Sequence, residues 1–539
     1  MPPSLFHGGR RRPGRFVLLL GLFFIGVLVA ELLGDYSQSN IKQVLLKQIK
    51  AYRSGGNNAN DPDGRCRVDN QTPGMGHTCD IEDDDSTGKD RPGQPAAQES
   101  NGGLGSVLNP TTIPGGAATH GFTVFDELYL RDGTLYVVTK DRKSFPRLPE
   151  ILAKPLKMEP GVSLVPTSDE MQFIKPERAR GRFGDHIHRF DGFTILVYDP
   201  SQFMHHYYHW WGEIVLGLWR VYSKLGVREG DTVTPLPFPK RFLAPFVEET
   251  GWRDRASMNG PLMRATFPGV AVETGHYWQD LIELDMTYVF SRVLVVNREA
   301  AHKHPFSSQW FKMIAGTMNV TAPEGFWDPI RHSLLTNLLG YEPQFSGPGI
   351  VVSPPKAASS APVVTYISRQ RTGRRLKQED HEALIEELMT LGGQGFCEVN
   401  VVQMEDMSLK DQIELAARTT VCLLETYHGE ELLLIANLRD QIMIGVHGNG
   451  LTHQLWMRPS ATSTVVELLV PGGYTYDFEL LARNMGHKHY AVWNDTCVTY
   501  PKGTTHKGIK YPPGFHGSQI PVWPETVANI IRQRLSGAE

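Results

Sequence analysis

The chain has 539 residues, more than one hydrophobic core usually organises, so we expect two folded domains with accessory segments. Its 54 basic and 58 acidic residues give a formal net charge of -4. No stretch interleaves basic with aromatic residues as nucleic-acid-binding proteins do, so nucleic acid is not an expected partner.

The N-terminus carries a predicted membrane anchor. Four arginines precede an apolar run from Phe16 to Leu33, which at about 1.5 Å per residue is just long enough to cross a thin bilayer. The positive flank predicts that residues 1–15 stay in the cytoplasm and that the rest enters the lumen, as in a single-pass type II protein. A cleaved signal peptide is the alternative, but the run is long for one and residues 28–30 form a poor cleavage site.

Residues 34–121 are predicted to form a flexible luminal stem. From Arg53 to Gly121 the chain has no Phe, Tyr or Trp, so it cannot bury enough surface to offset its ordering entropy. N-glycosylation acceptor patterns begin at Asn70, Asn319 and Asn494, which fits a luminal protein. The five cysteines are too few and odd in number for a disulfide scaffold, and their pairing cannot be deduced.

An N-terminal domain is predicted over residues 122–345. Residues 125–138 form two alternating runs around Asp132-Gly133, a hairpin signal, and residues 186–200 predict a second strand pair that turns at Asp191-Gly192. A long helix is expected from residue 205 to Gly226, a typical helix stop. A buried strand follows at residues 288–297.

After a proline-rich break near residues 345–360, strands and helices alternate. The expected strands and helices come in this order: 363–369, 377–392, 396–404, 408–419, 442–446, 450–457 and 463–470. This alternation is typical of a parallel sheet with crossover helices, so residues 346–520 are predicted to form a Rossmann-like domain. Residues 521–539 are predicted to form a C-terminal helix.

The turn after the strand at residues 442–446 is a candidate phosphate site. Gly448 and Gly450 allow a sharp turn and a close approach to a ligand, and the helix that follows offers unpaired N–H groups. His447 and Thr452 can add donors. Alternatively, His447 only caps the turn and the glycines serve packing.

Arginines follow another strand of the same domain. Arg369, Arg374 and Arg375 can bind a diphosphate bidentately, since ligands of such domains bind at the carboxyl ends of strands. The alternative is a solvated basic loop. Glu467, which follows a further buried strand, is predicted to accept hydrogen bonds from ribose hydroxyls.

The predicted helix from residue 205 holds the other candidate site. His205, His209 and Glu213 fall at i, i+4 and i+8 and so share one helical face. The face could bind zinc, although a zincin needs Glu directly after the first His. Otherwise Glu213 or His209 is a general base, or the polar residues are incidental on a helix buried by its aromatic side chains.

Five blocks of the sequence, taken together, resemble glycosyltransferase family 61 and occur in the same order along the chain, over roughly residues 122–500. They are HYYHWWGEIVLGLWRVY, TYISRQRTGRRL, SLKDQIELAARTT, GVHGNGLTHQLWM and VVELLVPGGYTYDFELLARNMGHKHY. The resemblance implies an α/β protein of the GT-B type with two Rossmann-like domains. It also implies an inverting enzyme of the Golgi or endoplasmic reticulum lumen that needs no obligate metal.

The resemblance also assigns residues. The family's H-G-x-G-L-T block falls on His447, Gly448, Gly450, Leu451 and Thr452, with Asn449 where a small residue is usual. The strand-end arginine falls on Arg369, and the histidine and acidic residue of the first block fall on His209 and Glu213. Residues 421–441 depart from the family, whose members run almost directly from the preceding helix into the next strand, and this segment could disturb the nucleotide pocket.

The resulting hypothesis is a transferase that moves xylose, N-acetylglucosamine or arabinose from a UDP-sugar to a glycan or glycoprotein. The C-terminal domain would hold the nucleotide, and Glu213, oriented by His209, would deprotonate the acceptor hydroxyl. Two alternatives remain. One is a catalytically inactive glycan-binding relative, and the other is a zinc-dependent hydrolase built on His205, His209 and Glu213.

Overall fold

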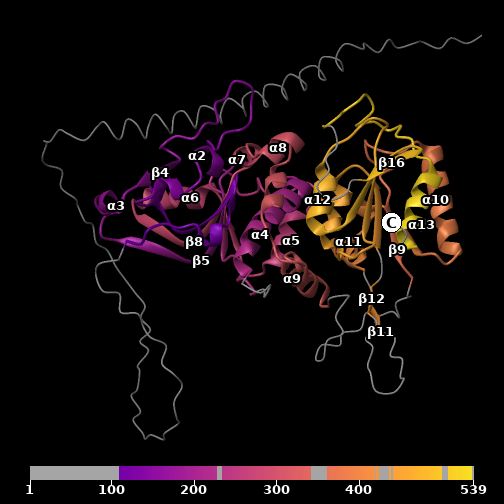
Figure 1. Ribbon diagram of the computed structural model, residues 1–539, viewed down its shortest axis with the longest axis horizontal. Helices are drawn as coiled ribbons and strands as arrows, with labels where there is room; N and C mark the ends of the chain where they lie inside the picture. Colours follow the sequence, from indigo (N-terminus) through magenta and orange to yellow (C-terminus); the bar gives the residue numbers. More distant parts are fainter. Residues whose placement is uncertain are drawn as a thin grey trace, which may run out of the picture. The chain divides into compact units, whose positions relative to one another are not determined.

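The computed structural model describes residues 108–227, 234–341, 361–418, 441–499 and 508–536, and the backbone of residues 421–423 and 436–438 (Figure 1). The predicted anchor at residues 16–33, most of the predicted stem and nearly all of the proline-rich break lie outside these ranges. Within them, no helix combines the length and apolar character that a bilayer crossing requires.

The first sheet is mixed. Its strand order is β4-β3-β2-β8-β5-β6-β7, and a short strand β1 pairs with β2. The strands are β1 (Ala118–Thr119), β2 (Phe122–Arg131), β3 (Thr134–Val138), β4 (Met171–Ile174), β5 (Ile187–Val197), β6 (Arg241–Leu243), β7 (Ala271–Glu273) and β8 (Thr287–Val296). β2 and β3 form the predicted hairpin, β8 is the predicted buried strand, and β8, β5, β6 and β7 run parallel to one another.

Two predictions for this part of the chain are wrong. The strand pair expected at residues 186–200 is the single strand β5, because both of its halves pair with β8 and the Asp191-Gly192 step forms a bulge between Phe190 and Phe193. The folded part also begins before Phe122. Thr111 donates its backbone N–H to the carbonyl of Val138 in β3, which ties the end of the predicted stem to the sheet.

The helix expected from residue 205 to Gly226 has three windings. It starts as a π-helix, η3 (Tyr208–Val215), continues as α4 (Leu216–Ser223) and ends, as predicted, in the 3-10 turn η4 (Lys224–Gly226). His205 lies in an exposed turn ahead of η3 and so does not share a helical face with His209 and Glu213.

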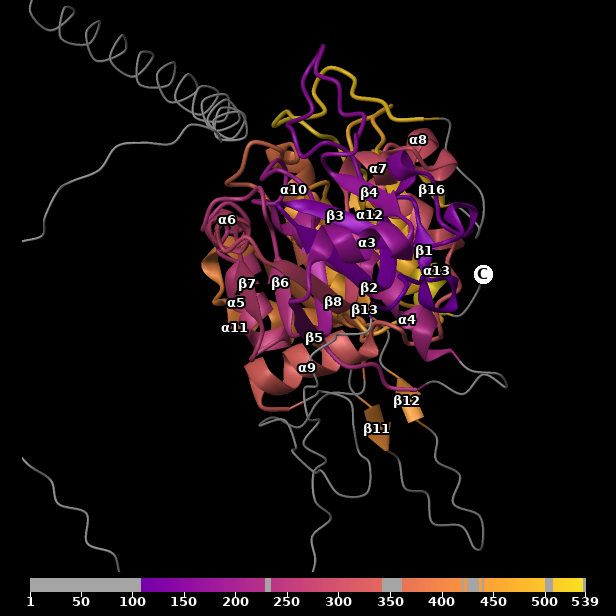
Figure 2. The same cartoon turned by 90° about the vertical axis from the view of Figure 1, so that its left-hand side faces the viewer.

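The second sheet has the predicted alternation. Its order is β10-β9-β13-β14-β15-β16, and only β16 is antiparallel to its neighbour. The strands are β9 (Val363–Ile367), β10 (Glu398–Val402), β13 (Gln441–Val446), β14 (Thr464–Leu468), β15 (Lys488–Trp493) and β16 (Thr496–Thr499). Helices α10 (Gln378–Gly393) and α13 (Pro524–Leu535), the latter within the predicted C-terminal helix, pack on one face. Helices α11 (Leu409–Ala417), η7 (Asn449–Trp456) and α12 (Asp477–Met485) cover the other (Figures 1 and 2).

The remaining elements connect or cover the sheets. They are η1 (Pro114–Gly116), η2 (Arg142–Ser144), α2 (Leu148–Ile151), α3 (Pro176–Phe183), α5 (Asn259–Thr266), α6 (Gly275–Glu283), α7 (Arg298–His302), α8 (Pro305–Trp310), η5 (Met313–Asn319), α9 (Asp328–Leu339), η6 (Met404–Asp406), β11 (Val421–Leu423) and β12 (Ala436–Leu438). β11 and β12 pair with each other, inside the segment that departs from the family pattern. The chain is thus a mixed α/β protein with two sheets that contain parallel strands.

One apolar core runs from the first sheet to the second, and aromatic residues of η3 and η7 lie at its centre. The rings of Trp211 and Trp456 meet edge to face with their centroids 5.3 Å apart. Trp456 donates its Nε1–H to the hydroxyl of Tyr207 over 2.9 Å, and Trp327 donates to the carbonyl of Leu455 over 2.9 Å. This shared core agrees with a single compact unit spanning Glu99–Glu539.

The shared core predicts how the protein unfolds. Trp456→Ala removes a fully buried ring and is expected to lower the free energy of unfolding by about 3–5 kcal/mol. Trp456→Phe loses only the bond to Tyr207 and some area, so a smaller loss is expected. Calorimetry should show one shifted transition in each variant, whereas Trp523→Ala, which truncates an exposed side chain, should leave the transition in place. Separate transitions for the two sheets would contradict a shared core.

Candidate functional site

The candidate site lies where the strand order of the second sheet reverses. β9 and β13 are neighbours in the sheet. After β9 the chain crosses to β10 on one side of this pair, and after β13 it crosses to β14 on the other side. The loops after β9 and β13 therefore diverge and leave a crevice at the carboxyl ends of the strands, the usual place for a ligand in such sheets. Arg369 follows β9 and His447 follows β13, so the structure brings together these two predicted residues.

A pocket of about 410 Å³ opens at this crevice. Its lining comes from segments far apart in the sequence, namely His206, Tyr208, His209, Lys312, Arg369, Arg374, His447, Gly448, Asn449, Asp477, Phe478, Tyr511, Phe515 and His516. Asp477 is the only carboxylate in this lining. The pocket is therefore rich in groups that can carry positive charge.

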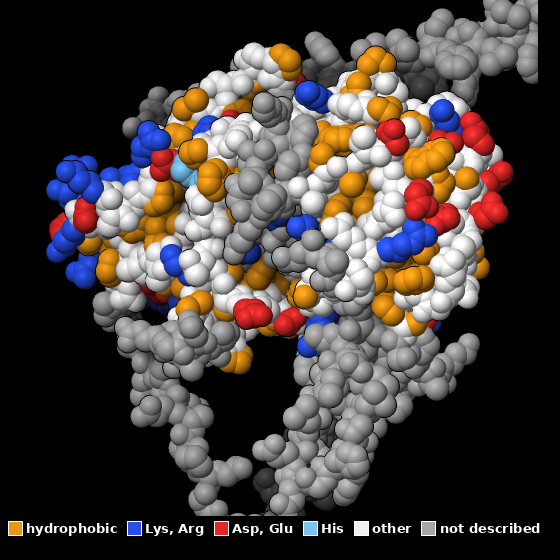
Figure 3. Space-filling view, turned by 45° about the vertical axis from the view of Figure 1, so that its right-hand side comes forward, with side chains coloured by type: hydrophobic (Ala, Val, Ile, Leu, Met, Phe, Trp, Pro, Cys, Tyr) orange, Lys and Arg blue, Asp and Glu red, His pale blue; other side chains and the backbone are white. Residues whose placement is uncertain are grey.

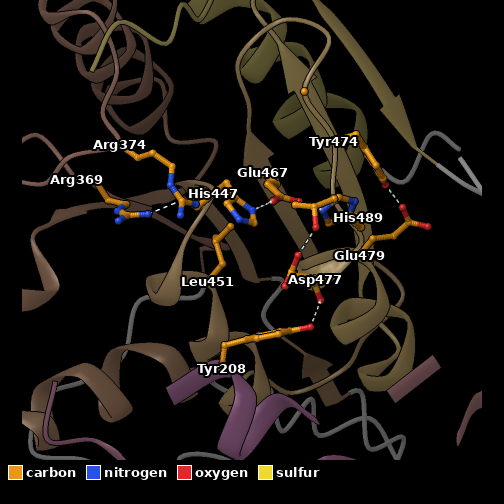
Figure 4. A network of polar contacts seen from close by, with 12 residues as sticks. Tyr208, Arg369, Arg374, His447, Leu451, Glu467, Tyr474, Asp477, Glu479 and His489 are labelled. Atoms are coloured by element: carbon orange, nitrogen blue, oxygen red, sulfur yellow. Dashed lines mark hydrogen bonds and ion pairs between the residues drawn. The ribbon is translucent and has the colours of Figure 1, made fainter. Parts of the chain in front are cut away.

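Two of the predicted arginines hold the turn after β13. Arg369 and Arg374 both donate to the carbonyl oxygen of His447, at 2.5 and 3.0 Å (Figure 4). Burial, followed by the repulsion from Arg374, lowers the pKa of Arg369 to about 10. Within the described part of the chain, no carboxylate forms an ion pair with either side chain. An anionic ligand would relieve this repulsion and supply the missing acceptors.

Gly448 makes the close approach of Arg369 possible. Its φ of 152° lies in a region that favours glycine, and a Cβ atom there would lie 1.6 Å from an Nη1 atom of Arg369. Gly450 serves packing instead, because its Cβ position lies 3.0 Å from the side chain of Ile367 in β9. Gly448 thus allows a close approach by Arg369, and Gly450 allows close packing on β9.

Four other predicted site residues do not line the pocket. Leu451 and Thr452 are buried in the core below η7, at 1% and 0% exposure. Arg375 instead donates to the carbonyl of Thr372. The ribose contact predicted for Glu467 is not available, because this side chain is fully buried below the turn.

Glu467 supports His447 from below. It accepts hydrogen bonds from Nδ1 of His447 and, over 2.8 Å, from Nε2 of His489 (Figure 4). Burial alone would raise the pKa of Glu467, but these two hydrogen bonds outweigh it and lower the pKa. With Nδ1 of His447 bound to the carboxylate, the ring is fixed and its other nitrogen is available on the pocket side.

On the opposite side of the pocket, His209 and not Glu213 faces the cavity. Nδ1 of His209 lies 2.6 Å from Oε2 of Glu213, whose side chain is only 1% exposed. Arg298 binds the same oxygen over 2.6 Å. Burial alone would raise the pKa of Glu213, but Arg298 and His209 hold it well below its ordinary value. Of this pair, His209 therefore lines the pocket, and Glu213 lies behind it in contact with Nδ1.

The three side chains predicted as a zinc site do not converge. His205 is exposed and outside the helix, while Glu213 is already held by Arg298. Within the described ranges, no group of three or more His, Cys, Asp or Glu side chains is arranged to hold a metal ion.

A partly buried ion pair in the pocket lining was not predicted from the sequence. Nζ of Lys312, ahead of η5, lies 2.8 Å from Oδ1 of Asp477 at the start of α12. Burial alone would raise the pKa of Asp477, but Lys312 lowers it to about 2, so the pair is charged at neutral pH. Tyr208 also donates to the backbone carbonyl of Asp477, over 3.3 Å (Figure 4). No spacing pattern links these two segments, so sequence reasoning could not pair them.

An aromatic wall closes one side of the pocket. The ring of His447 lies 5.2 Å from that of Phe478 and 5.3 Å from that of Phe515, measured between centroids. Tyr511 packs edge to face on Phe515 and remains 57% exposed. A flat apolar wall beside cationic groups suits an aromatic base joined to phosphate.

The outer surface differs from this pocket. On the face drawn in Figure 3, basic side chains gather mainly at the left-hand end of the view, where Figure 1 draws α3, and acidic ones are frequent at the other end. Exposed arginines of α3 are Arg178, Arg180 and Arg182. They are solvated, unlike the partly buried Arg369 and Arg374, and we assign them no site.

The glycine turn yields a prediction. Gly448→Ala should displace Arg369 and weaken binding of inorganic pyrophosphate about tenfold or more, the cost of one charge-assisted hydrogen bond. Isothermal titration calorimetry measures the affinity. Gly472→Ala is the matched control, because Gly472 also has a positive φ, of 78°, but has no atom within 4 Å of its Cβ position. Equal affinities for the two variants would argue against an anion site at the turn.

Comparison with known proteins gives no indication of the chemistry of the pocket. The chain matches no protein-family model, and no curated protein matches it by sequence.

Proposed function

We propose that the protein is an inverting glycosyltransferase that moves a sugar from a UDP-sugar to a hydroxyl of a glycan or glycoprotein. One observation carries the proposal: a single pocket holds two arginines to which the described residues offer no carboxylate on one side, and a histidine backed by a buried carboxylate on the other. The arginines suit a departing diphosphate, and the histidine suits removal of a hydroxyl proton. The resemblance of five sequence blocks to glycosyltransferase family 61 agrees with this chemistry.

In this proposal the donor binds at the carboxyl ends of β9 and β13. Its diphosphate lies against Arg369, Arg374 and the Gly448 turn, and its base lies against the wall of Phe478 and Phe515. Charge that develops on the leaving diphosphate meets donors that are already in place. The proposal therefore needs no metal ion to neutralise the leaving group. The donor sugar belongs to the xylose, N-acetylglucosamine or arabinose class.

The acceptor hydroxyl attacks the anomeric carbon from the face opposite the diphosphate. As the new oxygen–carbon bond forms, Nε2 of His209 takes the hydroxyl proton, and the bond from the anomeric carbon to the diphosphate oxygen breaks. UDP leaves with that electron pair, and the configuration at the carbon inverts. The Glu213 carboxylate, which lies against Nδ1 of His209, orients the imidazole ring for this step.

The two sheets are proposed to correspond to the two Rossmann-like halves of a GT-B enzyme. The parallel order of the second sheet and the site at its strand reversal support this assignment. The arginine-flanked apolar segment at residues 16–33 is proposed as a type II anchor that places the site in the lumen of the Golgi or endoplasmic reticulum.

A panel of nucleotide sugars tests the proposal. The full-length chain is incubated with each donor, with and without glycan acceptors, and released UDP and glycosylated product are measured. Turnover that survives a chelator is expected. Loss of turnover with the chelator would favour the zinc-dependent hydrolase, whereas acceptor binding without turnover for any donor would favour the inactive glycan-binding relative.

The two members of the proposed base pair should differ in effect. His209→Gln removes the proton acceptor and is expected to lower kcat about 10²- to 10⁴-fold with little change in donor affinity. Glu213→Gln keeps His209 and should cause a smaller loss. His188→Gln, on the exposed part of β5, is the control and should retain full activity. Unchanged kcat in His209→Gln would remove His209 from the mechanism.

A further inference from the structure

Behind the pocket lies a buried chain of charges that the proposed reaction does not use directly. Oε2 of Glu213 receives two positive or protonated partners: Nδ1 of His209 and Nη1 of Arg298, each at 2.6 Å. The side chains of Arg298 and Glu213 are 8% and 1% exposed. Two groups thus share one carboxylate oxygen, and this oxygen is shielded from bulk water.

Arg298 is held so that it cannot leave this position easily. It is the first residue of α7, and its backbone N–H donates to both carboxylate oxygens of Asp199, at 2.8 and 3.1 Å. Asn297 caps the same helix and also donates to Asp199, over 3.0 Å. The ring of Phe203 covers the guanidinium at 5.2 Å. Asp199 holds the backbone of Arg298 and Phe203 covers its side chain, so the position of the guanidinium charge is fixed.

Sharing the oxygen has a definite electrostatic effect on His209. A histidine paired with a buried carboxylate alone is protonated more readily, because the imidazolium neutralises the carboxylate. Arg298 supplies that neutralisation already, and its own positive charge opposes a second one on His209. Removal of the Arg298 charge is therefore expected to make protonation of His209 easier.

The other titratable or charged groups near His209 do not bind Oε2 of Glu213. From its own segment come His206 and Tyr208, whose rings lie 5.0 and 5.2 Å from that of His209. His302 of α7 interacts electrostatically with His209, and Lys312 and Asp477, which line the same pocket, are paired with each other. Arg298 alone among these groups shares the carboxylate oxygen with the histidine.

We infer that Arg298 is a positioning residue that sets the proton affinity of His209 by occupying the carboxylate oxygen to which the histidine is bound. This inference rests on the proposed function in so far as His209 is the base of the transfer reaction. The proton affinity itself, however, is a property of the protein without substrates. It can be measured whether or not the chain transfers a sugar.

The test is the titration of His209 in the full-length chain carrying isotope-labelled histidine, followed by NMR without substrates. The chain has 20 histidines, so the signal of His209 is assigned by its absence from the His209→Gln spectrum. Arg298→Gln is expected to raise the titration midpoint of His209 by about one pH unit or more, because a nearby positive charge is removed. The pH at which kcat/KM falls on the acid side of its profile should rise by the same amount. Activity lost at neutral pH should therefore return at higher pH.

Three further variants separate this effect from structural damage. Arg298→Lys keeps a charge but not the guanidinium geometry, so a smaller shift in the same direction is expected, and this variant carries the test if Arg298→Gln does not fold. Glu213→Gln should lower the midpoint. Arg220→Gln is the matched control, because Arg220 is partly buried and donates to the carbonyl oxygens of Thr317 and Val320, so it should leave the midpoint unchanged.

An unchanged midpoint in both folded Arg298 variants would overturn the inference, as would an activity loss that is equal at every pH. A raised midpoint in a chain that shows no turnover with any donor would leave the inference in place and overturn the proposed transferase function instead. The two failures are thus distinguishable.

Discussion

The contact between η3 and η7 is the interaction on which the candidate site depends. The rings of Trp211 and Trp456 pack together at the centre of the shared core, and a hydrogen bond from Trp456 to Tyr207 fixes their approach. Because η3 carries His209 and η7 starts directly after the turn at His447, burial of these aromatic surfaces brings both histidines to one pocket. Burial of the large apolar area of the tryptophans stabilises the contact, and the hydrogen bond from the indole N–H fixes the orientation of the ring.

Charges withdrawn from water determine the geometry around that contact. Glu213 and Glu467 are buried, Asp477 is mostly buried, and each is bound by side chains from other elements. An unpaired charge at such a depth costs several kcal/mol, so each pair holds its elements in one arrangement. The exception is the pair of Arg369 and Arg374, which the described residues leave without a carboxylate. Among the described residues, these two arginines therefore form a positive site whose charge no carboxylate compensates.

The sequence predicted the parts of this site that depend on chain order, and missed those that depend on pairing in space. The strand–helix alternation was enough to place Arg369 and the Gly448 turn at one edge of a parallel sheet. It could not tell on which side of a strand end a side chain lies, so Glu467 was expected in the pocket but is below it. Arg298 had no spacing pattern that linked it to its partner. The Asp191-Gly192 step becomes a bulge and not a turn because β8 pairs with both halves of β5, which local sequence does not encode.

The π winding of η3 makes the length of this segment as important as its composition. In a π-helix the backbone bonds run from residue i to i+5, one residue longer than in an α-helix. Removal of a single residue would let one turn of the segment relax to α geometry, while the chain on either side kept its relative orientation, because a π turn holds one residue more than an α turn. His209 and Glu213 both lie within this winding, so such a deletion would change how their side chains face each other. The length of the segment therefore determines the contact between Nδ1 of His209 and Oε2 of Glu213 as directly as the identity of the two residues does.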